Sequence, residues 1–175
     1  MRAKLGDAEA KVIFVSSREH LETILAIRSR VPSIERIVVF YPEGLAEDDL
    51  VMSLDSLKSL GAGRTHEEFE RLVRQVPGDA DLTIVYTSGT TGRPKGAVFD
   101  HARCLATLRH FAEWFTFEED DVAFTVGSLS AVSHLVATLH YFRSGIVNVV
   151  VGAGDAVGEQ LQQTSPTTML ATPHA

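Results

Sequence analysis

Short apolar runs alternate with amphipathic segments along the whole chain, and this alternation limits the folds that the chain can adopt. The runs are rich in β-branched residues and are predicted to be buried strands. They cover residues 11–15, 37–41, 82–86, 95–99, 122–126, 146–151 and 167–171. The amphipathic segments between them predict helices at residues 18–30, 48–60, 66–76, 101–115, 130–143 and 157–163. This order indicates an α/β fold with a mostly parallel sheet and flanking helices.

Two of the predicted helices have clear starting signals. Thr65 is followed three residues later by Glu68, the pattern of a capping box, in which each side chain bonds the other's backbone. Asp100 stands immediately before the helix predicted from residue 101, where a carboxylate can accept from free N–H groups. Both residues are therefore predicted to be helix N-caps.

Residues 86–96, Tyr-Thr-Ser-Gly-Thr-Thr-Gly-Arg-Pro-Lys-Gly, have the most biased composition of any stretch. They contain three glycines, four Ser or Thr hydroxyls and two cations, and they lie between two apolar runs. Glycine permits close backbone approach, and clustered backbone N–H groups form a concavity that binds anions. The hydroxyls and the mobile charge of Lys95 suit phosphate oxygens. The segment is predicted to hold a polyphosphate; an ordinary flexible hairpin loop is the alternative.

Two common nucleotide-binding loops do not match the chain. The Walker pattern requires Gly-Lys followed by Ser or Thr and opens a helix, whereas Lys95 is followed by glycine and precedes a predicted strand. The dinucleotide pattern Gly-x-Gly-x-x-Gly fails as well, because Gly152 and Gly154 are followed by Gly158, one residue too late. Gly152 and Gly154 are interpreted as turn residues.

The glycine-rich segment resembles the signature of the adenylate-forming (AMP-binding) superfamily, which includes acyl-CoA synthetases, luciferases and the adenylation domains of peptide synthetases. The family pattern, Tyr/Phe-Thr-Ser-Gly-Ser/Thr-Thr-Gly-x-Pro-Lys-Gly, is matched at all ten specified positions. Residues 11–40 and 79–81 and the helix before Pro77 resemble the long-chain fatty acyl-CoA synthetase branch. Residues 98–101 resemble the family's continuation, with Asp100 where threonine is usual.

The resemblance implies roles for particular residues. Those that would wrap the ATP phosphates are Thr87, Ser88, Gly89, Thr90, Thr91, Gly92 and Lys95. His134 is the candidate for the acyl pocket, because residues 130–134 resemble a family segment that ends Leu-Pro-Leu-x-His. Since the proline is missing here, a histidine on an amphipathic helix is the alternative. No residue is predicted with certainty to be catalytic, no metal ligand is predicted, and Cys104 is interpreted as a small core thiol.

Composition limits the classes of partner. Hydrophobic residues make up 45% of the 175 and charged residues 22%, as in soluble globular proteins. The net charge of -7 argues against a nucleic-acid partner. A single cysteine excludes an internal disulfide and fits a reducing compartment. Because no apolar run approaches the roughly 20 residues of a membrane span, a cytoplasmic protein is predicted, with peripheral membrane contact left open.

The resemblance also implies an activity: ATP-dependent activation of a carboxylic acid, here a fatty acid, through an acyl-adenylate, with transfer to coenzyme A. The implied small molecules are the carboxylate, ATP, Mg²⁺ and coenzyme A. Family members are longer on both sides, so residues 1–175 are predicted to be part of an N-terminal AMP-binding domain without its C-terminal domain, and inactive alone. A non-catalytic truncated remnant and an adenylating enzyme for aryl or amino acids are the alternatives.

Overall fold

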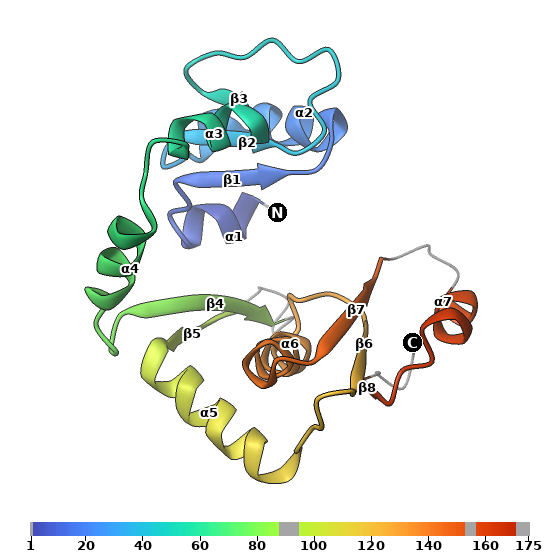
Figure 1. Cartoon of the computed structure of the whole chain (residues 1–175). Coiled ribbons are helices and arrows are strands. Elements are labelled where there is room, and N and C mark those ends of the chain that lie inside the picture. The colour runs from blue at the N-terminus through green and yellow to red at the C-terminus, as the bar shows by residue number, and fades with distance from the viewer. Residues whose placement is uncertain (1, 88–94, 153–156, 171–175) are drawn as a thin grey trace. The chain divides into compact units, whose positions relative to one another are not determined.

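The chain forms two compact units, each with its own hydrophobic core. The structure is a computed structural model that describes residues 2–87, 95–152 and 157–170, with side chains from residue 4 onward. The first unit comprises Met1–Val76 and Tyr86–Gly96, and the second comprises Pro77–Val85 and Ala97–Ala175 (Figure 1). Within the described residues, no helix is both long and apolar enough to cross a bilayer.

The first unit is built on a parallel sheet with strand order β1-β2-β3. Its elements are α1 (Arg2–Asp7), β1 (Val12–Val15), α2 (Arg18–Ile27), the 3-10 helix η1 (Arg28–Arg30), β2 (Arg36–Val39), β3 (Val51–Ser53), α3 (Leu54–Gly61) and α4 (His66–Arg74). The Ser17 hydroxyl caps α2 by accepting from the His20 N–H. Leu21 and Ile24 of α2 are buried in the core together with Ile37 of β2. The predicted strands at residues 11–15 and 37–41 are thus confirmed.

The helix predicted at residues 48–60 is wrong in its first half. Residues Val51–Ser53 form β3, and Val51 pairs in parallel register with Ile37. The Asp48 carboxylate accepts from the N–H groups of Leu50 and Val51 at 2.8 and 2.7 Å, which turns the chain into the strand. The helix begins only at Leu54, after the Ser53 cap. Tertiary pairing with β2 therefore overrides a local spacing that suits a helix.

The helix α4 has the predicted capping box and an uncovered apolar face. The Thr65 hydroxyl accepts from the Glu68 N–H at 3.2 Å, and the Glu68 carboxylate accepts from the Thr65 N–H at 3.0 Å. The apolar side chains that recur along this helix and just after it are 47–61% exposed; they are Phe69, Leu72, Val73 and Val76. The amphipathic pattern is therefore confirmed, but α4 is not buried on that face.

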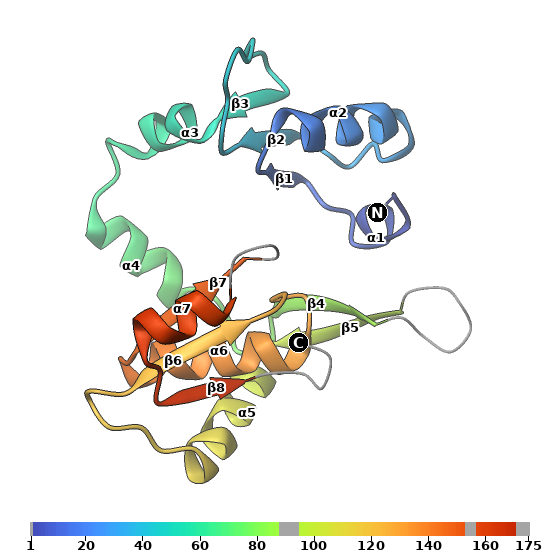
Figure 2. The ribbon, with the colours of Figure 1, turned by 90° about the vertical axis from the view of Figure 1, so that its right-hand side faces the viewer.

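The second unit is built on another parallel sheet, with strand order β7-β6-β8. The elements that follow α4 are β4 (Asp81–Thr87), β5 (Lys95–Asp100), α5 (His101–Trp114), β6 (Val122–Val126), α6 (Val132–Ser144), β7 (Val147–Val151), α7 (Val157–Thr164) and β8 (Thr168–Leu170). Figure 2 shows β6 between its two neighbours, and Figure 1 shows α6 and α7 on opposite sides of the sheet. Ala123, Ala137, Tyr141 and Ile146 form the core.

The predicted α/β class with parallel strands and flanking helices is confirmed, but the described strands divide among three sheets. The strands β4 and β5 pair only with each other and make a separate two-stranded sheet. These two strands flank the glycine-rich segment, so its described ends lie on this small sheet (Figure 2).

Candidate functional site

The described ends of the glycine-rich segment lie at adjacent strand ends. Thr87 is the last residue of β4 and Lys95 is the first of β5, and both are exposed. The other predicted phosphate-binding residues lie outside the described residues; they are Ser88, Gly89, Thr90, Thr91 and Gly92. Since Lys95 opens a strand, the local structure also differs from a Walker loop, whose lysine lies at the start of a helix. A hydroxyl and an ammonium group are thus accessible at one end of a strand pair.

Tyr86, the first residue of the signature, is held by α1. Its hydroxyl is 2.7 Å from an Asp7 carboxylate oxygen and 3.1 Å from the Lys4 carbonyl oxygen. The Lys4 ammonium lies 5.6 Å from the centre of the Tyr86 ring. The hydrogen bond to Asp7 raises the pKa of the Tyr86 phenol, and desolvation and the charge of Asp7 add to this effect. Sequence reasoning missed Asp7, because 79 residues separate it from Tyr86 and no local pattern marks it.

Asp100 joins the small sheet to α5. Its carboxylate accepts from the Arg103 N–H at 2.6 Å and lies 3.2 Å from the Arg103 guanidinium nitrogen Nε. The His101 N–H donates to the Ala80 carbonyl at 3.1 Å. Asp100 therefore caps the helix, as predicted, and β5 leads directly into α5.

His134 lies on α6 and is only 3% exposed. Its Nε2 is 2.9 Å from the Val126 carbonyl oxygen, which requires Nε2 to carry the proton and donate. The Ser133 hydroxyl lies 3.5 Å from Nδ1. Gly127 has a φ of +131°, and a Cβ at this position would lie 2.8 Å from His134 Nε2. The structure thus describes a buried, hydrogen-bonded histidine against the end of β6, and its role at an acyl pocket stays a prediction.

A second buried histidine, His140, lies six residues further along α6. Its Nε2 donates to the Phe115 carbonyl at 2.8 Å, which satisfies a free carbonyl where α5 ends. The rings of Phe111 and Phe117 lie 6.1 and 5.2 Å from the imidazole. The described part of the chain contains no group of three or more His, Cys, Asp or Glu side chains that could hold a metal ion.

Cys104 lies on α5 and is half-buried. Burial raises the pKa of its thiol, which lowers the fraction of reactive thiolate at neutral pH. It lines a small apolar cavity with Val85, Phe99 and Leu135. These surroundings agree with a packing role for the thiol.

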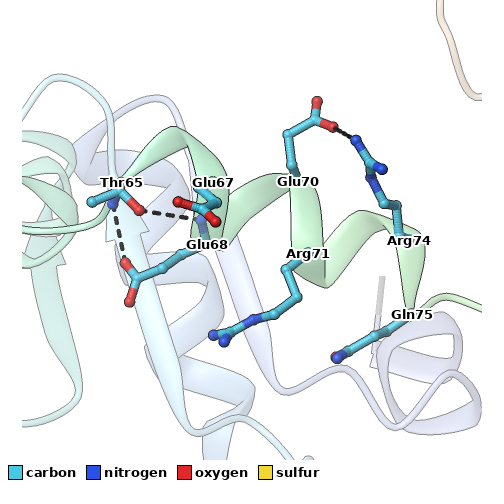
Figure 3. Close-up of a pocket in the computed structure, with 7 residues that line it drawn as sticks. All are labelled: Thr65, Glu67, Glu68, Glu70, Arg71, Arg74 and Gln75. Carbon is cyan, nitrogen blue, oxygen red and sulfur yellow. Dashed lines mark hydrogen bonds and ion pairs between the residues drawn. The ribbon is translucent and has the colours of Figure 1, made fainter.

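A hollow of about 650 Å³ lies along the polar side of α4 (Figure 3). All of its lining residues belong to α4 or flank it; they are Thr65, Glu67, Glu68, Glu70, Arg71, Arg74 and Gln75. Glu70 and Arg74 form an ion pair of 2.9 Å along the helix. Because one helix supplies the entire lining, this hollow is the solvated face of an amphipathic helix.

Comparison with known proteins identifies the family. The chain matches the AMP-binding enzyme family over residues 1–175 and belongs to it. It is 25% identical over 175 residues to the long-chain-fatty-acid–CoA ligase ACSBG1 of Bos taurus, covering 95% of this chain and 24% of the relative. It is 30% identical over 109 residues to the long-chain-fatty-acid–CoA ligase FadD15 of Mycobacterium tuberculosis, covering 62% of this chain and 17% of that protein. The chain thus spans about a quarter or less of the length of these relatives.

Solved structures share the fold at low sequence identity. The N-terminal domain of FACL13 from Mycobacterium tuberculosis superposes with a TM-score of 0.71 at 20% identity, over 99% of this chain and 40% of that one. A red-emitting luciferase from Phrixothrix hirtus gives a TM-score of 0.75 at 19% identity, over 99% of this chain and 34% of the luciferase. The fold is therefore that of part of an adenylate-forming enzyme, as the signature predicts.

Proposed function

We propose that this chain supplies the ATP phosphate-binding part of an AMP-forming acyl-CoA synthetase. One structural observation supports this most strongly: Thr87 and Lys95, two exposed residues of the family signature, are the last residue of β4 and the first residue of β5. Residues 1–175 would form part of the large N-terminal domain, in line with the fraction of its relatives that the chain spans. Thr87, Ser88, Gly89, Thr90, Thr91, Gly92 and Lys95 are the proposed phosphate ligands.

The proposed reaction has two steps. A carboxylate oxygen attacks the α-phosphorus of ATP, the bond to the β-phosphate breaks, and acyl-AMP and pyrophosphate form. The thiolate of coenzyme A then attacks the acyl carbon, and AMP leaves with the oxygen that came from the carboxylate. Lys95 and the hydroxyls would neutralise and orient the departing pyrophosphate, which lowers the barrier by electrostatic stabilisation and positioning. Mg²⁺ enters the proposal as part of the MgATP substrate.

A fatty acid is the proposed carboxylate. The long-chain-fatty-acid–CoA ligases from Bos taurus and Mycobacterium tuberculosis support this choice by their sequence similarity. His134, buried where β6 ends, is the residue of this chain proposed for the acyl pocket. The structural neighbours include an anthranilate–CoA ligase and the adenylation domain of a carboxylate reductase, so an aryl or other acid is the competing substrate class.

Pyrophosphate exchange in the full-length protein tests the proposal. Lys95→Ala should slow the acid-dependent exchange of labelled pyrophosphate into ATP about 10- to 100-fold, the cost of one lost charged hydrogen bond. Lys58→Ala is the matched control, because Lys58 is an exposed lysine of α3 that pairs with Asp55. Unchanged exchange in Lys95→Ala would refute the role of Lys95, and absence of exchange in the wild type would favour a non-catalytic remnant.

A further inference from the structure

We infer that Asp7 is a positioning residue that orients the start of the phosphate-binding segment through its hydrogen bond with Tyr86. The inference rests on the proposed function and extends it to α1. Asp7 and Tyr86 both belong to the first unit, although 79 residues separate them in the chain. Asp7 does not belong to the signature, and its contact with the signature is through the phenol of Tyr86.

Three contacts from α1 fix the Tyr86 side chain. A phenol has one proton to donate, and the carboxylate of Asp7 at 2.7 Å is a closer and stronger acceptor than the Lys4 carbonyl at 3.1 Å. The Lys4 ammonium, 5.6 Å from the ring centre, adds a cation–π contact with the ring. The ring is therefore restrained both at its hydroxyl and over its face.

Restraining Tyr86 also restrains Thr87. Successive side chains in a strand point to opposite faces, so holding the Tyr86 ring on one face of β4 keeps the Thr87 side chain on the other. The support matters because Thr87 is the exposed last residue of β4, in a sheet that has only two strands among the described residues.

The negative charge of Asp7 and its proposed positioning role predict opposite changes in ligand affinity when the charge is removed. Asp7 is negative and contacts Tyr86, which directly precedes the proposed phosphate ligand Thr87, so by electrostatics alone its removal should tighten the binding of an anion. If Asp7 instead orients Tyr86 and Thr87, its removal should weaken binding. Asp7→Asn removes the charge and keeps the shape, and Tyr86→Phe removes only the hydroxyl.

Calorimetry on the full-length protein, with MgATP and separately with pyrophosphate, measures whether the Kd rises or falls in these variants. Asp7→Asn and Tyr86→Phe should each raise the Kd about three- to tenfold, as expected for the loss of one charge-assisted hydrogen bond. The double variant should bind no more weakly than either single one, because both remove the same contact. Asp49→Asn, an exposed aspartate of the same unit, is the control and should leave the Kd unchanged.

A phenol titration at 295 nm provides a readout that does not depend on ligand. Subtracting the Tyr86→Phe curve from the wild-type curve isolates Tyr86, and the same subtraction in the Asp7→Asn background should show a lower pKa. An unchanged phenol pKa would show that Asp7 does not accept a hydrogen bond from Tyr86. A lowered phenol pKa with an equal or smaller Kd would overturn the positioning role. A wild-type protein that binds neither ligand would overturn the proposed function and its extension to α1, while the titration would still report the contact.

Discussion

Gly127 lies between β6 and the buried imidazole of His134, and replacing it with alanine tests how that histidine is held. The glycine has a φ of +131°, a conformation that side chains with a Cβ rarely adopt. An added Cβ would lie 2.8 Å from His134 Nε2, the atom that donates to the Val126 carbonyl. Gly127→Ala should therefore strain the backbone and also displace a buried hydrogen bond.

A second glycine of the same unit gives a reference value for backbone strain. Gly145, at the end of α6, has a φ of +75° and no atom within 4 Å of an added Cβ, so Gly145→Ala measures backbone strain alone, about 1 kcal/mol. Gly127→Ala adds the loss of the His134 hydrogen bond, so its total cost is about 3 kcal/mol. Gly61→Ala has neither effect, because Gly61 lies in α3 with open space around it, and it should be neutral or slightly stabilising.

Hydrogen exchange of the β6 amides in increasing urea measures the free energy of unfolding of the second unit. Gly127→Ala should lower this free energy by more than Gly145→Ala does. The reasoning would be refuted if the two variants were equally destabilised, since the contact with His134 would then contribute nothing. Gly61→Ala, in the first unit, is the control and should leave the exchange of the β6 amides unchanged.

Two further predictions concern carboxylates that bond to the backbone. Asp100→Ala should destabilise the second unit by about 1 kcal/mol, because α5 loses its cap. Asp100→Thr should retain most of the stability, since threonine can also cap a helix. Urea unfolding of both variants measures the two losses, and equal losses would contradict the capping role. The hydrogen bonds from Thr167 and from the Glu118 N–H lower the pKa of Asp121. Their contribution to stability is therefore complete above the pKa of an aspartate in the unfolded chain. It is lost as the pH falls through the lower pKa of Asp121 in the folded protein. Thr167→Val should raise the Asp121 pKa toward its ordinary value in a carboxyl-carbon NMR titration, and an unchanged pKa would show that Thr167 is not the main cause.

The sequence predicts those parts of the fold that depend on neighbouring residues. Apolar runs mark the strands at β1, β6 and β7, and the caps at Thr65 and Asp100 are confirmed because a cap and its partners lie within one turn. Val51 illustrates the limit. Its local spacing favours a helix, but parallel pairing with Ile37 across the sheet places it in a strand.

In the candidate site too, local sequence patterns were predictable and contacts between distant residues were not. The signature that begins at Tyr86 and includes Lys95 is contiguous, so the sequence alone identifies it. Its described ends lie on the paired strands β4 and β5. The bond between Asp7 and Tyr86 joins two distant parts of the chain and has no counterpart in local composition. The hydrogen bond of His134 to the Val126 carbonyl likewise depends on how the end of β6 meets α6.

Isotope transfer from the carboxylate tests adenylate formation most directly. The full-length protein would be incubated with MgATP, coenzyme A and a long-chain fatty acid labelled with ¹⁸O in its carboxylate, and the products analysed by mass spectrometry. Attack on the α-phosphorus predicts ¹⁸O in AMP, with pyrophosphate unlabelled. Label in inorganic phosphate, or conversion of ATP to ADP, would show attack at the γ-phosphate and contradict the proposed chemistry.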